Sequence, residues 1–284
     1  MGSLIVTEYV DVPYLKRQDT IFLARVWTPP KNVGTKAVIV DVHGGAWCDG
    51  NRKAGHHYDR QLASRGFTVV AVDFRCGPKY CHPDASTDVA AAVHWARLQA
   101  QQIAENSDQV VTIGSSSGGH LGLLAALRPH LQDERGTELW IDGEWVIQNS
   151  INGQVKNVAV FWAPVDPLAR YRYASSMDTR LGQRLSANTV AYFRDESAMH
   201  DASIARIMVE EPPTQIPGVW FARAGKDLNV PAELVDQLAR TYRTAGGSFQ
   251  LEDYPNSEHG FAHSDSEQTQ QFVEDLICWI NTTL

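Results

Sequence analysis

Two patterns of hydrophobic and polar positions divide the chain. Over the first 28 residues the two kinds alternate, which is typical of strands with one buried face. One strand is predicted across Leu4–Val6 and Tyr9–Val10, and a second at Ile21–Trp27, which Pro29-Pro30 ends. Farther along, short continuous apolar runs rich in Val and Ile favour strands buried on both faces, as in a parallel sheet. These runs are Ala37–Val42, Phe67–Val72, Gln109–Ile113, Val155–Trp162 and Val219–Ala222.

Helical segments lie between the predicted strands. Ala85–Gln102 carries apolar residues on one helical face, and Pro231–Ala245 begins with a proline suited to a first turn and ends at Gly246-Gly247. Two further helices and a last strand are predicted at Leu121–Leu127, Ser264–Thr282 and Ser248–Tyr254. Strands that alternate with helices indicate βαβ units. The predicted fold class is therefore α/β, with a mostly parallel sheet of about eight strands flanked by helices.

One stretch breaks this alternation. Between Pro164 and Pro217 the sequence mixes polar, apolar and aromatic residues and shows no clear strand pattern. We interpret residues 164–217 as a helical insertion that forms a cap over the C-terminal edge of the sheet. Because no linker, repeat or low-complexity segment sets this stretch apart, residues 1–284 are predicted to form a single domain.

Charge and composition exclude several classes of protein. The 284 residues carry a net charge of −8 without a basic cluster, which argues against nucleic-acid binding. No apolar run approaches the length of about 20 residues that spans a bilayer, and no signal-peptide pattern begins the chain. We therefore expect a cytoplasmic protein that does not bind membranes. The four cysteines are predicted to be reduced thiols, although Cys76 and Cys81 could form a bridge in an oxidising compartment.

A candidate nucleophile lies in Gly114-Ser115-Ser116-Ser117-Gly118, between a predicted strand and a predicted helix. A catalytic serine on such a tight turn needs glycine two positions before it and two after it, because the neighbouring backbone approaches closely. Ser116 alone of the three serines has glycine at both positions. We therefore assign Ser116 as the nucleophile.

The segment His43-Gly44-Gly45-Ala46-Trp47 follows the strand at Ala37–Val42. Backbone N–H groups of such a glycine-rich loop can stabilise the negative oxygen of a tetrahedral intermediate, together with the N–H after the nucleophile. We predict that Gly45, Ala46 and Ser117 supply these donors. His43 lies at the wrong place along the chain for the base and is interpreted as structural.

The nucleophile needs a base and the base needs an acid, in the chain order serine, acid, histidine. His259 follows the last predicted strand, with His263 as the weaker candidate. Asp227 follows a buried strand and precedes a helix, which makes it the preferred acid over Asp166. Two further residues are interpreted as structural rather than reactive: His120, expected to pack or cap, and Glu258, expected to be exposed.

These segments resemble α/β-hydrolases of the hormone-sensitive-lipase-like and feruloyl-esterase-like carboxylesterase branch. The resemblance rests on His43–Trp47, Gly114–Leu121, Asp227–Pro231 and His259–Phe261 and covers nearly the whole chain. The acid loop departs from the family by placing one residue, rather than two, between Gly225 and Asp227. Kynurenine formamidases carry a similar oxyanion loop. The resemblance implies Ser–His–Asp acyl transfer to water without a cofactor or metal.

The leading functional hypothesis is hydrolysis of small to medium carboxylic esters, aromatic ones included, through an acyl-enzyme on Ser116. The alternatives are an arylformamidase acting on an amide such as N-formylkynurenine, a natural-product tailoring hydrolase or cyclase with the same triad, and a catalytically inactive binding protein. The expected partner is a small-molecule ester or amide, and the oligomeric state stays open, a dimer included. Four aromatic residues are pocket candidates: Trp47, Trp162, Tyr171 and Tyr173.

Overall fold

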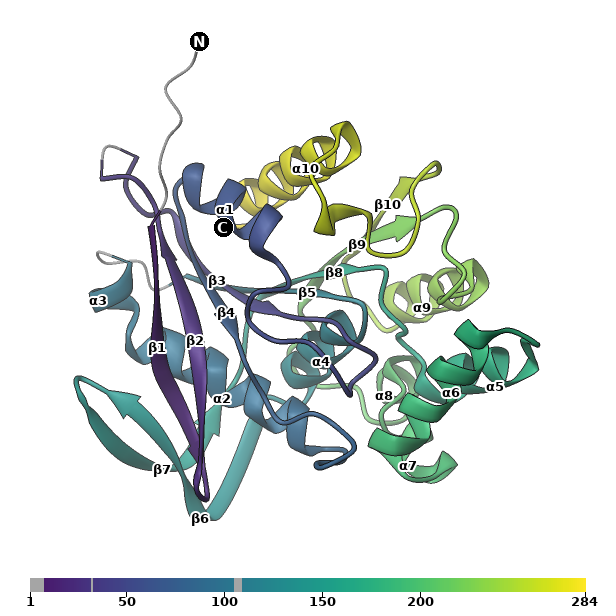
Figure 1. Ribbon diagram of the computed structural model, residues 1–284, viewed down its shortest axis with the longest axis horizontal. Coiled ribbons are helices and arrows are strands. Elements are labelled where there is room, and N and C mark those ends of the chain that lie inside the picture. Colours follow the sequence, from purple (N-terminus) through teal and green to yellow (C-terminus); the bar gives the residue numbers. More distant parts are fainter. Residues whose placement is uncertain (1–7, 32, 105–108) are drawn as a thin grey trace.

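A ten-stranded sheet organises the molecule (Figure 1), in the computed structural model that describes residues 8–31, 33–104 and 109–284. The strand order is β10-β9-β8-β5-β3-β4-β2-β1-β6-β7. From β10 to β4 neighbouring strands run parallel, and from β4 to β7 they run antiparallel. The strands of the parallel part are β3 (Ala37–Val42), β4 (Phe67–Val72), β5 (Val110–Ser115), β8 (Asn157–Phe161), β9 (Gly218–Ala224) and β10 (Phe249–Tyr254).

The strands of the parallel part form where the sequence has its apolar runs. Every residue of β3 and of β4 is buried. Strands of this kind contact helices on both faces of the sheet, so they have no solvent-facing side that would favour polar residues. The antiparallel part contains β1 (Glu8–Arg17), β2 (Thr20–Thr28), β6 (His130–Ile141) and β7 (Glu144–Asn152).

Helices cover both faces of the sheet. On one face α1 (His56–Ser64) and α10 (Glu267–Thr283) share a hydrophobic cluster with the sheet. The apolar side of α10 is built by Phe272, Val273, Leu276 and Ile280, at helical spacing. On the other face a second cluster includes α2 (Asp84–Leu98), α4 (Ser117–Leu127) and α9 (Ala232–Thr244). The short helix α3 (Ala100–Ile103) follows α2.

The segment between β8 and β9 forms four helices, which Figure 1 shows in green as one group at the side of the molecule. They are α5 (Pro167–Ser176), α6 (Arg180–Phe193), α7 (Glu196–Asp201) and α8 (Ile204–Glu210). A polar side chain caps the first turn of each: Asp166, Thr179, Asp195 and Ser203. Because these caps satisfy orphan N–H groups, the segment starts a new helix after each short connection.

The predicted fold class is confirmed, with differences at the edges of the sheet. The eight predicted strands correspond to β1–β5 and β8–β10, although Leu4–Val6 lies outside the described residues. The hairpin of β6 and β7 and the helix α1 were not predicted. Eight of the nine residues of β7 are exposed or half-buried, on both faces of the strand, so no alternation of buried and exposed positions marks it.

Candidate active site

The turn between β5 and α4 holds Ser116 in a strained backbone conformation, with φ 51° and ψ −126°. Such a conformation costs a non-glycine residue about 1–3 kcal/mol and is often found at functional sites. Glycine is required on both sides. A Cβ on Gly118 would lie 2.0 Å from the carbonyl oxygen of Val42, and a Cβ on Gly114 would lie 2.6 Å from the backbone of Gly118. These close contacts explain the requirement for glycine on both sides, on which the assignment of Ser116 from the sequence rests.

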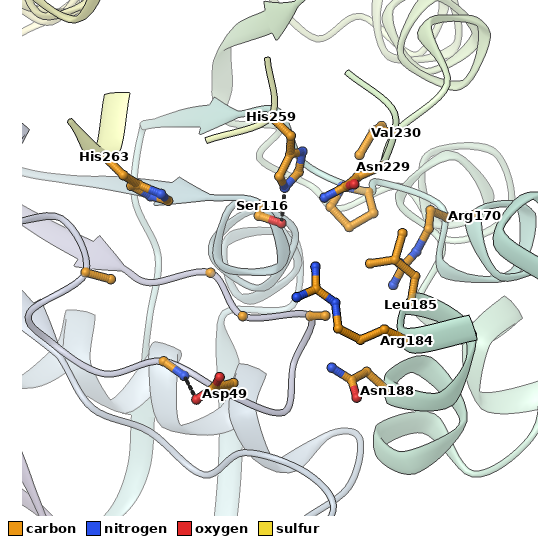
Figure 2. Close-up of a pocket in the computed structure, with 16 residues that line it drawn as sticks. Asp49, Ser116, Arg170, Arg184, Leu185, Asn188, Asn229, Val230, His259 and His263 are labelled. Carbon is orange, nitrogen blue, oxygen red and sulfur yellow. Dashed lines mark hydrogen bonds between the residues drawn. The ribbon is translucent and has the colours of Figure 1, made fainter. Parts of the chain in front are cut away.

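Three side chains form a hydrogen-bonded chain at the C-terminal ends of neighbouring strands. The Oγ of Ser116 lies 3.0 Å from Nε2 of His259, and Nδ1 of His259 lies 2.8 Å from Oδ2 of Asp227. Ser116 follows β5, Asp227 follows β9, and His259 follows β10. Figure 2 shows the imidazole of His259 pointing down at the hydroxyl of Ser116. The structure thus brings together the three residues that the sequence singled out.

Asp227 is fixed on both of its oxygens. Its Oδ1 accepts the backbone N–H groups of Asn229 and Val230 at 2.6 and 3.1 Å, and its Oδ2 faces His259. The side chain is 5% exposed. A carboxylate held in this way accepts the Nδ1–H of His259, which leaves the lone pair of Nε2 directed at the serine hydroxyl. The shorter Gly225-Lys226-Asp227 loop therefore still delivers the acid to the base.

The rival residues occupy other positions. Asp166 caps α5 by accepting the N–H of Ala169 at 2.9 Å, and it also accepts the hydroxyl of Ser203 at 3.0 Å. Glu258 is exposed, as expected. His263 borders the same cavity as Ser116, but the ring that faces the serine oxygen is that of His259.

The loop after β3 is strongly bent. Gly45, Ala46 and Trp47 have φ values of 129°, 49° and 62°, and the carbonyl of Gly45 accepts the N–H groups of Cys48 and Asp49 at 3.1 and 3.0 Å. Gly45 and Ala46 border the cavity together with Ser116. Ser117 is the first residue of α4, where backbone N–H groups have no partner within the helix. The three predicted oxyanion donors therefore lie around the nucleophile.

His43 is hydrogen-bonded to this loop and packs against the core. Its Nδ1–H donates to the carbonyl of Gly44 at 2.7 Å, and its ring stacks on Phe74 with 4.1 Å between centroids. Burial lowers the pKa of His43 and keeps the ring neutral. This agrees with its interpretation as a structural residue.

A cavity of about 370 Å³ opens at Ser116. The glycine-rich loop and His259 form one side of it, and α5 and α6 form the opposite side (Figure 2). Besides Ser116, His259 and His263, the polar side chains that line it are those of Asp49, Arg170, Arg184, Asn188 and Asn229. None of these was predicted from the sequence. Asn229 could have been found, since it lies two residues after the acid in a loop already assigned to the site.

The predicted aromatic pocket is wrong, because none of the four aromatic residues lines the cavity at Ser116 in the described structure. Trp47 and Trp162 are each 1% exposed and belong to the core. Trp47 packs against Phe193, and Trp162 packs against Phe261. Tyr171 packs partly buried against the core, and the hydroxyl of Tyr173 donates to the carbonyl of Leu228 at 3.3 Å. Position after a strand places a residue near the site but does not decide which way its ring points.

All four cysteines are free thiols, so Cys76 and Cys81 form no bridge in this structure. In the part of the chain that the structure describes, three or more His, Cys, Asp or Glu side chains do not gather at a common point. No described helix combines the length and apolar character that crossing a bilayer requires.

The parallel sheet, the nucleophile turn after β5 and the order serine, aspartate, histidine define an α/β-hydrolase. The fold is shared with solved esterases. That of Pyrobaculum calidifontis matches with a TM-score of 0.74 at 21% identity, covering 98% of this chain and 85% of that one. Esterase 2 of Thermogutta terrifontis with propionate bound matches with a TM-score of 0.70 at 20% identity, covering 96% and 94%.

The chain belongs to the BD-FAE family, whose model matches residues 25–240. Esterase LipC of Mycobacterium tuberculosis is 26% identical over 275 residues, which cover 93% of this chain and 62% of LipC. An arylesterase of Saccharolobus solfataricus is 25% identical over 198 residues, covering 69% of this chain and 60% of that enzyme. The chain thus spans about three fifths of these relatives. The family resemblance predicted from the sequence is confirmed.

Proposed function

We propose that this protein is a serine hydrolase that cleaves carboxylic esters through an acyl-enzyme on Ser116. One observation carries the proposal: Ser116, His259 and Asp227 are joined at 3.0 and 2.8 Å beside an open cavity. The names of the relatives, which include an esterase and an arylesterase, support the same chemistry. A cavity of about 370 Å³ suits a substrate of small to medium size.

The geometry supports a two-step reaction. His259 accepts the proton of the Ser116 hydroxyl while the oxygen attacks the ester carbonyl, and Asp227 stabilises the imidazolium that forms. The resulting oxyanion accepts hydrogen bonds from the N–H groups of Gly45, Ala46 and Ser117. The C–O bond to the alcohol then breaks, and His259 returns the proton to the departing oxygen. Water attacks the acyl-enzyme in the same manner and releases the acid and the free serine.

Hydrolysis of 4-nitrophenyl acetate and 4-nitrophenyl butyrate tests this proposal, with the Ser116→Ala variant as control. We expect turnover by the wild type and its loss in the variant. A fluorophosphonate probe should label Ser116, as located by peptide mass spectrometry. Lack of labelling together with lack of ester turnover would contradict the proposal and favour a binding protein.

The same assay separates the related chemistries. N-Formylkynurenine is offered beside the esters, because an amide can be cleaved by the same triad. Exclusive turnover of the formamide would replace the ester assignment by an arylformamidase. Product that forms only by cyclisation, or by transfer to an acceptor other than water, would assign a tailoring enzyme.

A further inference from the structure

A buried arginine without an acidic partner borders the cavity. Arg170, on α5, is 2% exposed, and its Nη2 donates to the hydroxyl of Thr189 at 2.8 Å. Its Nε is buried without an acceptor, and its guanidinium lies 4.9 Å from the ring centroid of Trp47. Among the described residues, no carboxylate lies within ion-pair distance of Arg170. Burying a cation without a counter-charge is costly, so such an arrangement calls for an anion from outside the protein.

A second arginine points into the same space. Figure 2 shows the guanidinium of Arg184 extending from α6 toward Ser116, with the amide of Asn188 one helical turn further along. Arg184 likewise forms no ion pair with a carboxylate of the described chain. An exposed arginine without an ion pair loses little free energy, but two arginines on one wall make the electrostatic potential of the cavity positive.

The remaining charged and titratable groups on the cavity wall do not cancel this field. Asp49 is the single carboxylate that borders the cavity within the described residues, and it is exposed and accepts the N–H of Gly50 at 2.7 Å. His259 is engaged with Ser116 and Asp227, and His263 is the other histidine of the wall. On the cavity wall two guanidinium groups therefore face one carboxylate, and the carboxylate of Asp227, which does not line the cavity, is hydrogen-bonded to His259. Burial lowers the pKa of Arg170 only to about 10, so its charge persists at neutral pH.

We propose that the substrate is an ester that carries a carboxylate, and that Arg184 and Arg170 bind this carboxylate while the ester carbonyl lies at Ser116. The proposal rests on the proposed esterase function and names its substrate class. The planar fork of a guanidinium matches the two oxygens of a carboxylate. Binding the anion across the cavity from the nucleophile would also orient the ester, which is how a remote group of the substrate contributes to catalysis.

The carboxylate can belong to the acyl part or to the alcohol part of the ester, and two pairs of substrates distinguish them. For the acyl part, monoethyl succinate is compared with its neutral amide, ethyl succinamate. For the alcohol part, 3-carboxyphenyl acetate is compared with 3-carbamoylphenyl acetate. Each amide has nearly the shape of its carboxylate partner but lacks the charge. Hydrolysis is followed by titration of the released acid at constant pH.

In the wild type we expect kcat/KM to favour the carboxylate by about 10-fold or more in one of the two pairs, since charged hydrogen bonds are among the stronger ones. Arg184→Gln should lower this preference by about 10-fold, and Arg184→Lys should retain part of it. Arg172→Gln is the matched control. Arg172 is an exposed arginine on the same group of helices, paired with Glu196 at 2.7 Å and outside the cavity. This control should leave the preference unchanged.

The proposal is overturned if the wild type prefers neither carboxylate substrate over its amide. It is also overturned if a preference for the carboxylate persists in both Arg184→Gln and Arg170→Gln. If the buried Arg170→Gln does not fold, Arg184→Gln alone decides. Calorimetric binding of the intact substrates to Ser116→Ala provides a readout that needs no turnover. Tighter binding of the carboxylate, lost on adding Arg184→Gln, would support the anion site even if ester hydrolysis failed. Turnover of neutral esters without an anion preference would leave the esterase proposal standing and remove this one.

Discussion

The indole Nε1–H of Trp47 donates to Nδ1 of His120 at 3.2 Å. On the other side of the ring, Nε2–H of His120 donates to the carbonyl of Ala202 at 2.8 Å. One imidazole thus connects the oxyanion loop, the helix after the nucleophile and the helical segment between β8 and β9. Both ring nitrogens are occupied only in the neutral form, because a protonated ring could not accept from Trp47. His120 therefore packs and bridges rather than reacts, as expected from the sequence.

The bridge makes stability depend on pH through His120. Burial lowers the pKa of its imidazole from 6.5 to about 4. Between these values the unfolded chain binds the proton and the folded protein does not, so stability falls as the pH falls from 7 to 5, by about 2 kcal/mol for this residue. Urea unfolding at pH 7 and pH 5 measures the effect, and His120→Asn should remove it.

At each pH, the free energy of unfolding of the variant is subtracted from that of the wild type. Burial raises the pKa of the Asp41 carboxyl to about 7, so that group favours the folded state as the pH falls and opposes the trend. The difference cancels this contribution. His130→Asn, at an exposed position on β6, serves as control. If the free energy of unfolding falls as much between pH 7 and pH 5 in His120→Asn as in the wild type, the interpretation of His120 as a neutral, structural residue is refuted.

The roles of the two aspartates can be separated by the same substitution at each. Asp227→Asn removes the acceptor for Nδ1–H of His259 and favours the wrong tautomer, so we expect kcat to fall by about 10⁴-fold. Asp166→Asn should change kcat little, because asparagine also caps a helix well. Steady-state kinetics on 4-nitrophenyl acetate provides the comparison. A larger loss from Asp166→Asn would reverse the assignment of the acid.

The close approach at the nucleophile turn predicts a strong effect of a single methyl group. Gly118→Ala would place a Cβ 2.0 Å from the carbonyl oxygen of Val42, so the turn must shift. We expect loss of most activity and a lower melting temperature. Gly122→Ala, in the same helix, is the matched control, since its Cβ would meet only side-chain methyl groups, of Thr112 at 3.0 Å and of Val42 at 3.9 Å, and alanine favours helices. Equal behaviour of the two variants would argue against a sterically determined turn.

The triad was predictable because chain order and strand ends determine where its members lie. Ser116 and Asp227 follow the mostly buried strands β5 and β9, and His259 follows the more polar strand β10. Residues just after parallel strands meet at one edge of the sheet. Arg170 and Arg184 were not predictable, since their position depends on how α5 and α6 pack over that edge. For the same reason Trp47 was wrongly predicted to line the pocket: its large ring packs into the core, where it buries the most apolar area. The cytoplasmic location and the cap role of residues 164–217 stay predictions.

The position of α5–α8 between β8 and β9 separates two tasks along the chain. Ser116, Asp227 and His259 come from other connections of the sheet, whereas Arg170 and Arg184 both come from this one continuous stretch. An exchange of a single segment between relatives could therefore alter which molecules are accepted while the bond-breaking apparatus is inherited unchanged. New substrate ranges can arise in such an enzyme by recombination at two points, with both junctions at the ends of strands that the core already stabilises.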